Sequence, residues 1–430
     1  MNDIRFGFAD TVITPSRPDC VYLDGYGHRM HPAEGVRDEL HAKVAAITDG
    51  TTTFLLFSLD LIGMRRPVYE LLTNQITALC GVPRSHIALA CTHTHSAPAT
   101  GILDELPLNT DYFAYVGECC GRAALDALER ATTGSLQAEL LPEQLQHSFN
   151  RRGRDVIDRS MRAAAFRDTK GNLRGVLCTA SCHAVINTSY RISADWLSVL
   201  NEASTDACPY LFFQGRGADI NPYTEQALAP DDFIRALGSE LTDAIAAFLT
   251  RPATAAPLQG SLSVCYEDVT LPMMKHNDLD ALRAAIREHE KAYFACAPDD
   301  LQKHFNLREL QWLRHMLRLA ESDSSFEITV PLQLLKIGDA MAFAFVPFEL
   351  LTLTGNKIEQ MLLDAGYDRG SIYVCGYSNI TESYLAPVEE LPYGGYEAGG
   401  GASHWYKLPH CSEQTEPTLL HWFADHSAKE

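Results

Sequence analysis

The sequence predicts an α/β fold with layered mixed sheets flanked by helices and a helical insertion at about 277–320. In the first half of the chain, short continuously apolar runs, typical of buried strands, alternate with amphipathic helical patterns. Two charged amphipathic helices then interrupt this alternation. Strands and a helix return before a long loop over 379–412, rich in Gly, Tyr and Pro, and such loops are often functional.

The first half of the chain is predicted to follow a βαβα order. The expected strands lie at 54–59, 86–91, 175–179 and 210–213. The expected helices, recognised by one apolar face, lie between the first two strands, at about 111–131 and at about 231–249.

The second half begins with the helical insertion, which contains two helices separated near 298–300. The expected elements after it are strands at 328–337 and 341–346, a helix at 349–364 and a strand at 372–375. The sequence contains no internal repeat and no low-complexity segment, and 430 residues are enough for one large core or two domains.

Composition and charge limit the kinds of protein that this chain can be. Hydrophobic residues make up 46% and charged residues 21% of the 430 residues, as in ordinary globular proteins. The net charge of -20 disfavours nucleic acid as a partner, because an acidic surface repels phosphate backbones. No run of about 18 apolar residues exists, so no transmembrane segment is expected.

The expected location is the cytoplasm. The 12 cysteines are scattered without a CxxC pair, as is typical of reduced thiols in a cytosolic protein. The N-terminal segment lacks a basic region followed by a long apolar stretch, so we do not expect it to be a signal peptide.

Two histidines directly follow the strand predicted at 86–91. One residue separates His93 from His95, so in extended backbone their side chains point to the same side. Ligands bind at the ends of strands in α/β sheets, and imidazole is the commonest metal ligand near neutral pH. The pair is therefore a candidate metal or catalytic site, with polar residues that cap a strand as the alternative.

Two later segments share this context. His183 ends a strand-like run and is followed by a polar stretch that contains Asp195, although a lone histidine after a strand is more often structural. A Gly-rich turn at 214–222 contains Asp219, for which hydrogen bonds within the turn are a simpler explanation than catalysis.

Several separated segments resemble, in the same order, motifs of the neutral ceramidase family. They are Phe8-Ala-Asp-Thr-Val-Ile-Thr-Pro15, Gly35-Val-Arg-Asp-Glu-Leu40, Ser58-Leu-Asp60, Thr92-His-Thr-His-Ser96, Ser181-Cys-His183, Gly217-Ala-Asp-Ile-Asn-Pro222 and Val346-Pro-Phe-Glu349. The resemblance covers nearly the whole chain. It implies a single neutral-ceramidase-like catalytic domain over 1–430.

The resemblance implies that this protein is a zinc-dependent amidase. Such an enzyme cleaves the C–N amide bond of an N-acyl substrate by attack of metal-bound water, with one zinc ion per chain. The implied substrate is a small-molecule or lipid-like N-acyl amide. The implied metal ligands are His93, His183, Glu349 and Tyr384, and the implied catalytic residues are His95, Arg151 and Tyr396. His95 would orient water or move a proton, while the other two would stabilise the oxyanion.

The chain departs from the family's pattern at several positions. Ala97 and Ala99 replace glycines, and Phe348 replaces the glycine before the ligand glutamate. Asn221 replaces a serine, which excludes a serine nucleophile at that position. The family's C-terminal β-sandwich and secretion signal are not expected here. These differences leave open the acyl and amine groups and whether long-chain ceramide is accepted.

Other interpretations of the same residues remain. A (β/α)8 amidohydrolase also uses an HxH pair. A non-catalytic ceramidase-like binding protein is another possibility, as is a related zinc enzyme that acts on an ester or lactone or forms an amide in biosynthesis. Without the resemblance, Glu349 is equally an acid at a helix N-terminus, and Tyr384 and Tyr396 are loop packing. The sequence does not indicate an oligomeric state.

Overall fold

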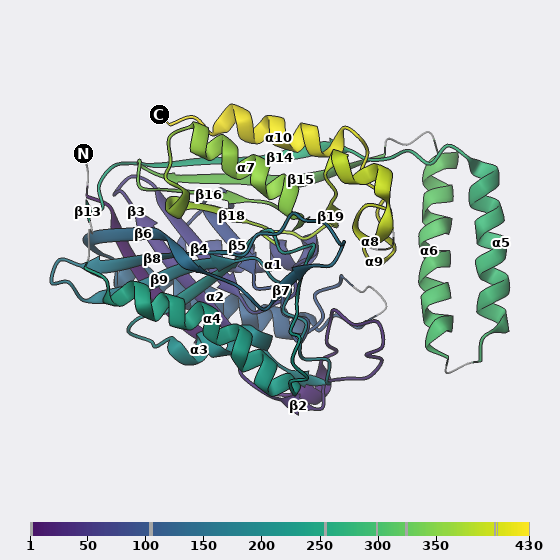
Figure 1. The fold of residues 1–430 in the computed structure, drawn as a ribbon, viewed down its shortest axis with the longest axis horizontal. Coiled ribbons are helices and arrows are strands. Elements are labelled where there is room, and N and C mark those ends of the chain that lie inside the picture. Colours follow the sequence, from purple (N-terminus) through teal and green to yellow (C-terminus); the bar gives the residue numbers. More distant parts are fainter. Residues whose placement is uncertain are drawn as a thin grey trace.

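Two β-sheets are stacked face to face, with helices on both outer sides (Figure 1). The computed structural model describes residues 3–102, 106–252, 256–297, 300–322, 326–399, 401 and 403–429. Within these ranges the larger sheet has nine strands and the smaller sheet four. The prediction of layered mixed sheets flanked by helices is therefore confirmed.

The larger sheet has the order β11-β9-β8-β6-β1-β3-β4-β5, with β13 beside β6. Within this sheet, only β4–β5 and β9–β11 are parallel among the pairs of described strands, so the (β/α)8 interpretation is wrong. Its strands are β1 (Arg5–Val12), β3 (His41–Thr48), β4 (Thr53–Leu59), β5 (Ile87–Cys91), β6 (Thr132–Gln144), β8 (Ser160–Asp168), β9 (Leu173–Ala180), β11 (Tyr210–Gln214) and β13 (Ala256–Pro257).

The smaller sheet packs its apolar face on the larger one. Its strands are β14 (Leu262–Pro272), β15 (Glu327–Ile337), β16 (Met341–Phe345) and β18 (Ile372–Cys375), in that order. Alternate residues of β4 divide between two cores: Phe54 and Leu56 face the smaller sheet, whereas Leu55 faces the helices. The rings of Phe54 and Phe345 stack across the sheets with centroids 6.1 Å apart.

Helices cover the outer face of each sheet (Figure 1). Those on the larger sheet are α1 (Arg66–Cys80), α2 (Thr110–Glu129), α3 (Ser198–Ala203) and α4 (Pro230–Thr250). Those on the smaller sheet are α7 (Thr352–Asp364) and α10 (Thr415–His426). The long helices lie where the apolar periodicity predicts them, because their buried faces fill the cores beneath them.

The helical insertion forms a hairpin that projects from the two sheets at the right of Figure 1. Its helices are α5 (Leu279–Ala295) and α6 (Leu301–Glu321), so the predicted insertion is confirmed. The expected break at Pro298 and Asp299 lies outside the described residues. The two helices share a small core of their own that includes Leu282, Ile286 and Leu313.

Short elements occupy the connections. Among the described residues, three two-stranded ribbons pair β2 (Gly35–Val36) with β10 (Arg191–Ile192), β7 (Ser148–Asn150) with β12 (Ile220–Pro222), and β17 (Glu349–Leu350) with β19 (Tyr384–Leu385). The expected loop over 379–412 also carries η5 (Val388–Tyr393), α8 (Gly395–Ala398) and α9 (Ser403–Tyr406). Further 3-10 turns are η1 (Pro18–Cys20), η2 (Arg84–His86), η3 (Asp195–Leu197) and η4 (Arg369–Ser371).

The helix predicted to begin at Glu349 begins instead at Thr352. Glu349 and Leu350 are extended because they pair in parallel with Tyr384 and Leu385 of β19. The sequence prediction was wrong here because this partner lies far along the chain and leaves no local signal.

The larger sheet curls so that its two ends approach each other. Lys43 of β3 donates to the backbone carbonyl of Tyr210 in β11 (3.0 Å), and Ser58 of β4 donates to that of Phe212 (2.6 Å). Residues 376–378 then lie between the two ends. The Cys91 amide donates to the Tyr377 carbonyl, and the Gly376 amide donates to the Gln214 carbonyl. Each of these two hydrogen bonds is 3.0 Å long. The ends of β5 and β9 are thereby brought to one place.

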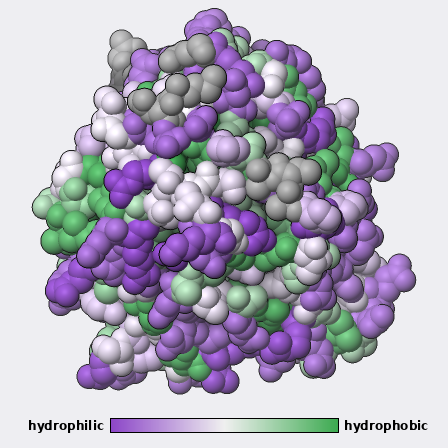
Figure 2. Space-filling model, turned by 90° about the vertical axis from the view of Figure 1, so that its left-hand side faces the viewer, coloured by the Kyte–Doolittle hydropathy of each residue, from purple (hydrophilic) through white to green (hydrophobic). Residues whose placement is uncertain are grey.

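The surface agrees with the acidic, polar composition. Figure 2 shows the face at the left of Figure 1, where hydrophilic residues predominate and hydrophobic residues form small separate areas. In the parts of the chain that the structure describes, no helix combines the length and the apolar character needed to cross a membrane.

Candidate metal centre

Three histidines converge at the curled end of the larger sheet. One ring nitrogen from each of His93, His95 and His183 lies within 4.8 Å of the other two. The Nε2 atoms of His93 and His95 are 3.1 Å apart, and the ring of His93 lies 4.8 Å from that of His183. His93 and His183 are each about 1% exposed. The two histidines that sequence analysis placed after separate strands therefore share one buried site.

His93 does not reach the site through extended backbone, as the spacing had suggested. Its φ is 64°, in the left-handed region that residues other than glycine rarely adopt. Its amide donates to the Leu61 carbonyl (2.9 Å), so the chain turns sharply after β5. Such backbone strain often occurs at functional sites. The prediction that the HxH pair shares a cavity holds, but its stated reason was wrong.

Backbone carbonyls fix the tautomers of the three imidazoles. The Nδ1 atom of His93 lies 2.6 Å from the Ile62 carbonyl oxygen, and that of His183 lies 2.7 Å from the Gly217 carbonyl oxygen. The Nδ1 atom of His95 lies 3.2 Å from the Gly25 carbonyl oxygen. Because a carbonyl only accepts, each Nδ1 carries the proton. All three Nε2 lone pairs are then directed to the centre.

Glu349 supplies a carboxylate to the same centre. Its Oε2 atom lies 3.4 Å from Nε2 of both His93 and His183. Its Oε1 atom accepts a hydrogen bond of 2.5 Å from Tyr406. Neither Oε2 of Glu349 nor Nε2 of His183 has a hydrogen-bond partner among the described residues, although both atoms are fully buried. Buried polar atoms of native proteins are nearly always paired, so this pair of orphan atoms requires an explanation.

The electrostatics of the site favour a bound cation. Burial lowers the pKa of His93 to about 3, and burial together with His93 and His183 lowers the pKa of His95 well below its ordinary value. Burial alone would raise the pKa of Glu349, but His93, His183 and Tyr406 lower it to about 2. At neutral pH the site thus holds the neutral imidazoles of His93 and His95 together with a buried anion. Converging lone pairs and a carboxylate fit a divalent ion of the kind that His and Glu ligate.

Tyr384 lies beside Glu349 because β19 pairs with β17. Burial raises the pKa of its phenol well above the ordinary value, and Glu349 adds to this. The Tyr384 hydroxyl accepts a hydrogen bond of 3.1 Å from Nη2 of Arg151. The same guanidinium donates hydrogen bonds of 2.7 Å to Glu397 and 3.2 Å to Asn221. Arg151 is therefore held in one orientation, with its charge directed along the Tyr384 side of the site.

Tyr396 lies at the surface, beside Tyr384. The ring centroid of Tyr396 is 5.6 Å from that of Tyr384. The Arg151 guanidinium lies 5.5 Å from the centroid of the Tyr396 ring. Tyr396 is 44% exposed, in contrast to the buried ligand candidates. It borders a surface pocket of about 630 Å³, whose other lining residues are Arg151, Arg152, Arg154, Tyr393, Gly394, Gly395 and Glu397. The structure thus brings together all seven candidate residues.

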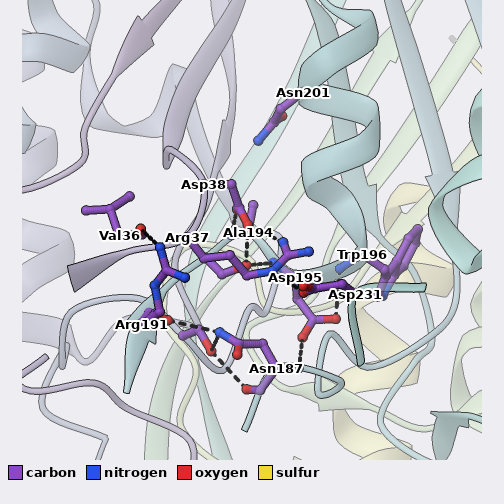
Figure 3. A network of polar contacts seen from close by, with 12 residues as sticks. Val36, Arg37, Asp38, Asn187, Arg191, Ala194, Asp195, Trp196, Asn201 and Asp231 are labelled. Carbon is purple, nitrogen blue, oxygen red and sulfur yellow. Dashed lines mark hydrogen bonds and ion pairs between the residues drawn. The ribbon is translucent and has the colours of Figure 1, made fainter. Parts of the chain in front are cut away.

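A polar network holds the segment that follows His183 (Figure 3). The Asp195 carboxylate accepts hydrogen bonds from the backbone amides of Asn187 (2.6 Å) and Trp196 (2.8 Å). Asp38 accepts from the backbone amide of Ala194 (2.6 Å) and is paired with Arg37 at 2.5 Å. This segment in turn meets the HxH loop, because Thr94 donates to the Ser193 carbonyl (2.6 Å). The network explains how the two histidine loops keep a fixed spacing.

Asp219 has a wider structural role than the predicted turn. Its carboxylate accepts hydrogen bonds from the backbone and side chain of Thr352 and from the side chain of Asn150. These partners lie far away in sequence, so the expectation of hydrogen bonds within the turn was wrong. Asp219 links the Gly-rich segment to the start of α7 and to the residue before Arg151.

Sequence analysis missed two tyrosines of the site. Tyr406 donates to Glu349, and the ring of Tyr377 lies 4.0 Å from that of His93. Tyr406 lies in the long loop that had been marked as functional, but no spacing rule singles it out. Tyr377 has a φ of 53°, which the sequence does not reveal.

No family model matches the sequence, and no curated protein is significantly similar to it. The neutral ceramidase of Pseudomonas aeruginosa matches with a TM-score of 0.75 at 19% identity, covering 99% of this chain and 74% of that chain. The fold is that of the neutral ceramidases. A ceramidase complexed with C2 also matches, with a TM-score of 0.73 at 18% identity, covering 99% of this chain and 75% of that chain.

The neutral ceramidase fold accommodates the unusual residues noted in the sequence. Phe348 is fully buried in the main core, so its ring packs among apolar residues. Ala97 and Ala99 are also buried, and each makes a backbone hydrogen bond to the segment 22–24. Asn221 accepts a hydrogen bond from Arg151.

Proposed function

We propose that this protein is a zinc-dependent amidase that cleaves the C–N bond of an N-acyl substrate. Under this proposal His93, His183, Glu349 and Tyr384 hold the metal, while His95, Arg151 and Tyr396 act on the substrate. The names of the structural neighbours, which are ceramidases, support an N-acyl amide as the substrate class. One catalytic domain over 1–430 is part of the proposal.

The observation that carries the proposal is the placement of Glu349. Its Oε2 atom lies 3.4 Å from the Nε2 atoms of two imidazoles, and no described residue offers it a hydrogen bond. Without a cation, a buried carboxylate oxygen that faces imidazole lone pairs is costly. A zinc ion bound there would supply Lewis acidity, which polarises carbonyl groups and lowers the pKa of water.

The neighbouring side chains can perform the remaining chemistry. Arg151 carries a permanent positive charge, and Glu397 and Asn221 orient it. Together with the Tyr396 hydroxyl, it can stabilise negative charge that develops on the carbonyl oxygen of the substrate. The His95 Nε2 lone pair can accept a proton and then deliver it to the leaving amine, because the ring is neutral at pH 7.

The pocket beside Tyr396 favours a polar substrate group. The pocket beside Tyr396 is lined by three arginines and Glu397 rather than by aliphatic side chains. Arg154 lies over the Tyr393 ring at 4.0 Å and is about one-third exposed, so it can contact a ligand. All three arginines form ion pairs with Glu390 or Glu397, so we propose that one side of the scissile amide carries a polar group. This favours small N-acyl amides over substrates with apolar chains on both sides.

We also propose a cytoplasmic location. All 12 cysteines are free thiols, as in proteins of reducing compartments.

The test combines metal analysis with a substrate panel. Purified protein is measured by elemental analysis, stripped with a chelator and reconstituted with zinc, and assayed on N-acyl amides of graded chain length and headgroup charge. We expect one zinc per chain, with activity that is lost on stripping and restored by zinc. Wild-type protein without stoichiometric zinc, or full activity after stripping, would contradict the proposal.

The same panel separates the alternatives. Faster turnover of esters or lactones than of amides would change the reaction class but keep the metal site. Amide formation from an acid and an amine would indicate a biosynthetic enzyme. Zinc binding with no turnover of any compound would favour a binding protein.

A further inference from the structure

Tyr406 contacts one oxygen of Glu349, and the other oxygen faces the imidazoles. Its hydroxyl donates to Oε1 of Glu349 over 2.5 Å, which leaves Oε2 facing His93 and His183. Both side chains are about 95% buried or more. Since water does not compete at such a site, the hydrogen bond restricts rotation of the carboxylate.

We propose that Tyr406 is a positioning residue that makes Glu349 a metal ligand through one oxygen only. The inference rests on the proposed metal site and extends it, because Tyr406 touches neither substrate nor metal in this role. Groups that hydrogen-bond to metal ligands orient them and tune their strength. Tyr406 would act in this way on the carboxylate, as the carbonyls of Ile62 and Gly217 do on the imidazoles.

The position of Tyr406 depends on the helical hairpin. Trp405, its neighbour, lies against the Arg308 guanidinium of α6 at 3.8 Å. Trp312 of α6 donates from its indole to the Leu408 carbonyl over 2.8 Å. His404 forms an ion pair with Glu309 of the same helix. The segment that carries Tyr406 is thus held on α6 from both sides, and the hairpin supports the metal centre indirectly.

The test is Tyr406→Phe, which keeps the ring in its apolar surroundings and removes only the donor. The matched control is Tyr373→Phe, because the buried Tyr373 hydroxyl also makes one hydrogen bond, to the Leu177 carbonyl (3.1 Å), away from the site. Zinc affinity is measured by competition with a chelator, and the cobalt-substituted proteins are compared by visible absorption. Should Tyr406→Phe not fold, Tyr406→Met takes its place.

We expect Tyr406→Phe to bind zinc about 10- to 100-fold more weakly, as is typical when a partner of a metal ligand is removed. Its cobalt spectrum should also change, because the freed Oε1 can join the coordination. Tyr373→Phe should match the wild type in both. If Tyr406→Phe has the zinc affinity and cobalt spectrum of the wild type, or if both variants lose equal zinc affinity, this inference is overturned and the proposed function is not. Wild-type protein that binds no zinc would overturn the proposed function as well.

Discussion

Glu349 and Tyr384 are directly paired residues of the parallel strands β17 and β19. The pairing places a carboxylate and a phenol side by side at the edge of the histidine cluster, although they are far apart in sequence. Tyr384 also accepts a hydrogen bond from Arg151, so it connects the proposed ligands to the proposed oxyanion-binding group.

Tyr384→Phe tests this connection. The variant keeps the ring but removes a proposed ligand and a partner of Arg151, so both zinc affinity and kcat should fall. We expect a loss of about 100- to 1000-fold in kcat, the usual effect of losing one oxyanion-stabilising group, because Arg151 loses the hydroxyl that helps to position it. Tyr112→Phe is the control, because its buried hydroxyl bonds to the Ile13 carbonyl (2.8 Å) instead. Unchanged zinc affinity in Tyr384→Phe would show that Tyr384 is not a ligand.

The roles of the two histidines of the HxH pair can be separated. His93→Ala should lose both zinc and activity. His95→Ala should keep zinc and lose about 100- to 10,000-fold in kcat, because only proton transfer is removed. Elemental analysis and steady-state kinetics measure both. The Nε2 atoms of the two residues lie only 3.1 Å apart, so loss of zinc from His95→Ala would identify His95 as a ligand.

The hairpin should contribute to stability mainly through α6. Trp312 is 4% exposed and contacts His404 and His410, so Trp312→Ala should cost about 3–5 kcal/mol in the free energy of unfolding. Phe294 is 79% exposed on the neighbouring helix, and Phe294→Ala should change stability by less than about 0.5 kcal/mol. Denaturant unfolding measures both variants. If the two variants lose a similar free energy of unfolding, Trp312 does not attach the hairpin firmly to the rest of the protein.

Asp195 should make stability depend on pH. Burial raises its pKa from 3.8 to about 6, although backbone amides of Asn187 and Trp196 partly oppose this. Between these values the folded protein binds more protons than the unfolded chain. The contribution of the Asp195 carboxyl group to the free energy of unfolding is therefore complete below pH 3.8 and is lost as the pH rises through about 6.

The comparison of wild type with Asp195→Asn isolates this effect. Asn suits the positive φ of 58° at this position, but it cannot titrate. Measured on metal-free proteins, the stability advantage of the wild type should be about 1 kcal/mol larger at pH 5 than at pH 8. An advantage that does not change with pH would show that Asp195 titrates as it does in the unfolded chain.

Much of the fold could be predicted from local patterns. Strands such as β4 and β5 are uninterrupted apolar runs, and the long helices have one apolar face. The strands β3 and β8 escaped prediction because each contains a buried cation in an alanine-rich run. Lys43 is bonded to Asn201 and to β11, and Arg162 to Glu359 of α7. Partners so far away in sequence leave no local signal.

The same limit applies to the candidate site. The histidines could be found because each follows a strand, and the remaining candidates came only from the resemblance to neutral ceramidases. Tyr406 and Tyr377 were missed because their positions depend on the docking of α9 and on a left-handed turn. Asp219 was assigned to its own turn because its partner Thr352 could not be identified from sequence spacing.

The curling of the larger sheet has a consequence for the order of events during biosynthesis. The 376–378 segment joins the end of β5 to the end of β11, which lies beside β9, and Glu349 is held in place by the pairing of β17 with β19. A nascent polypeptide that has not yet reached Tyr384 therefore lacks a complete candidate centre. Under the proposed function, the metal is acquired only after β17 and β19 have paired, so the supply of the ion acts late in folding.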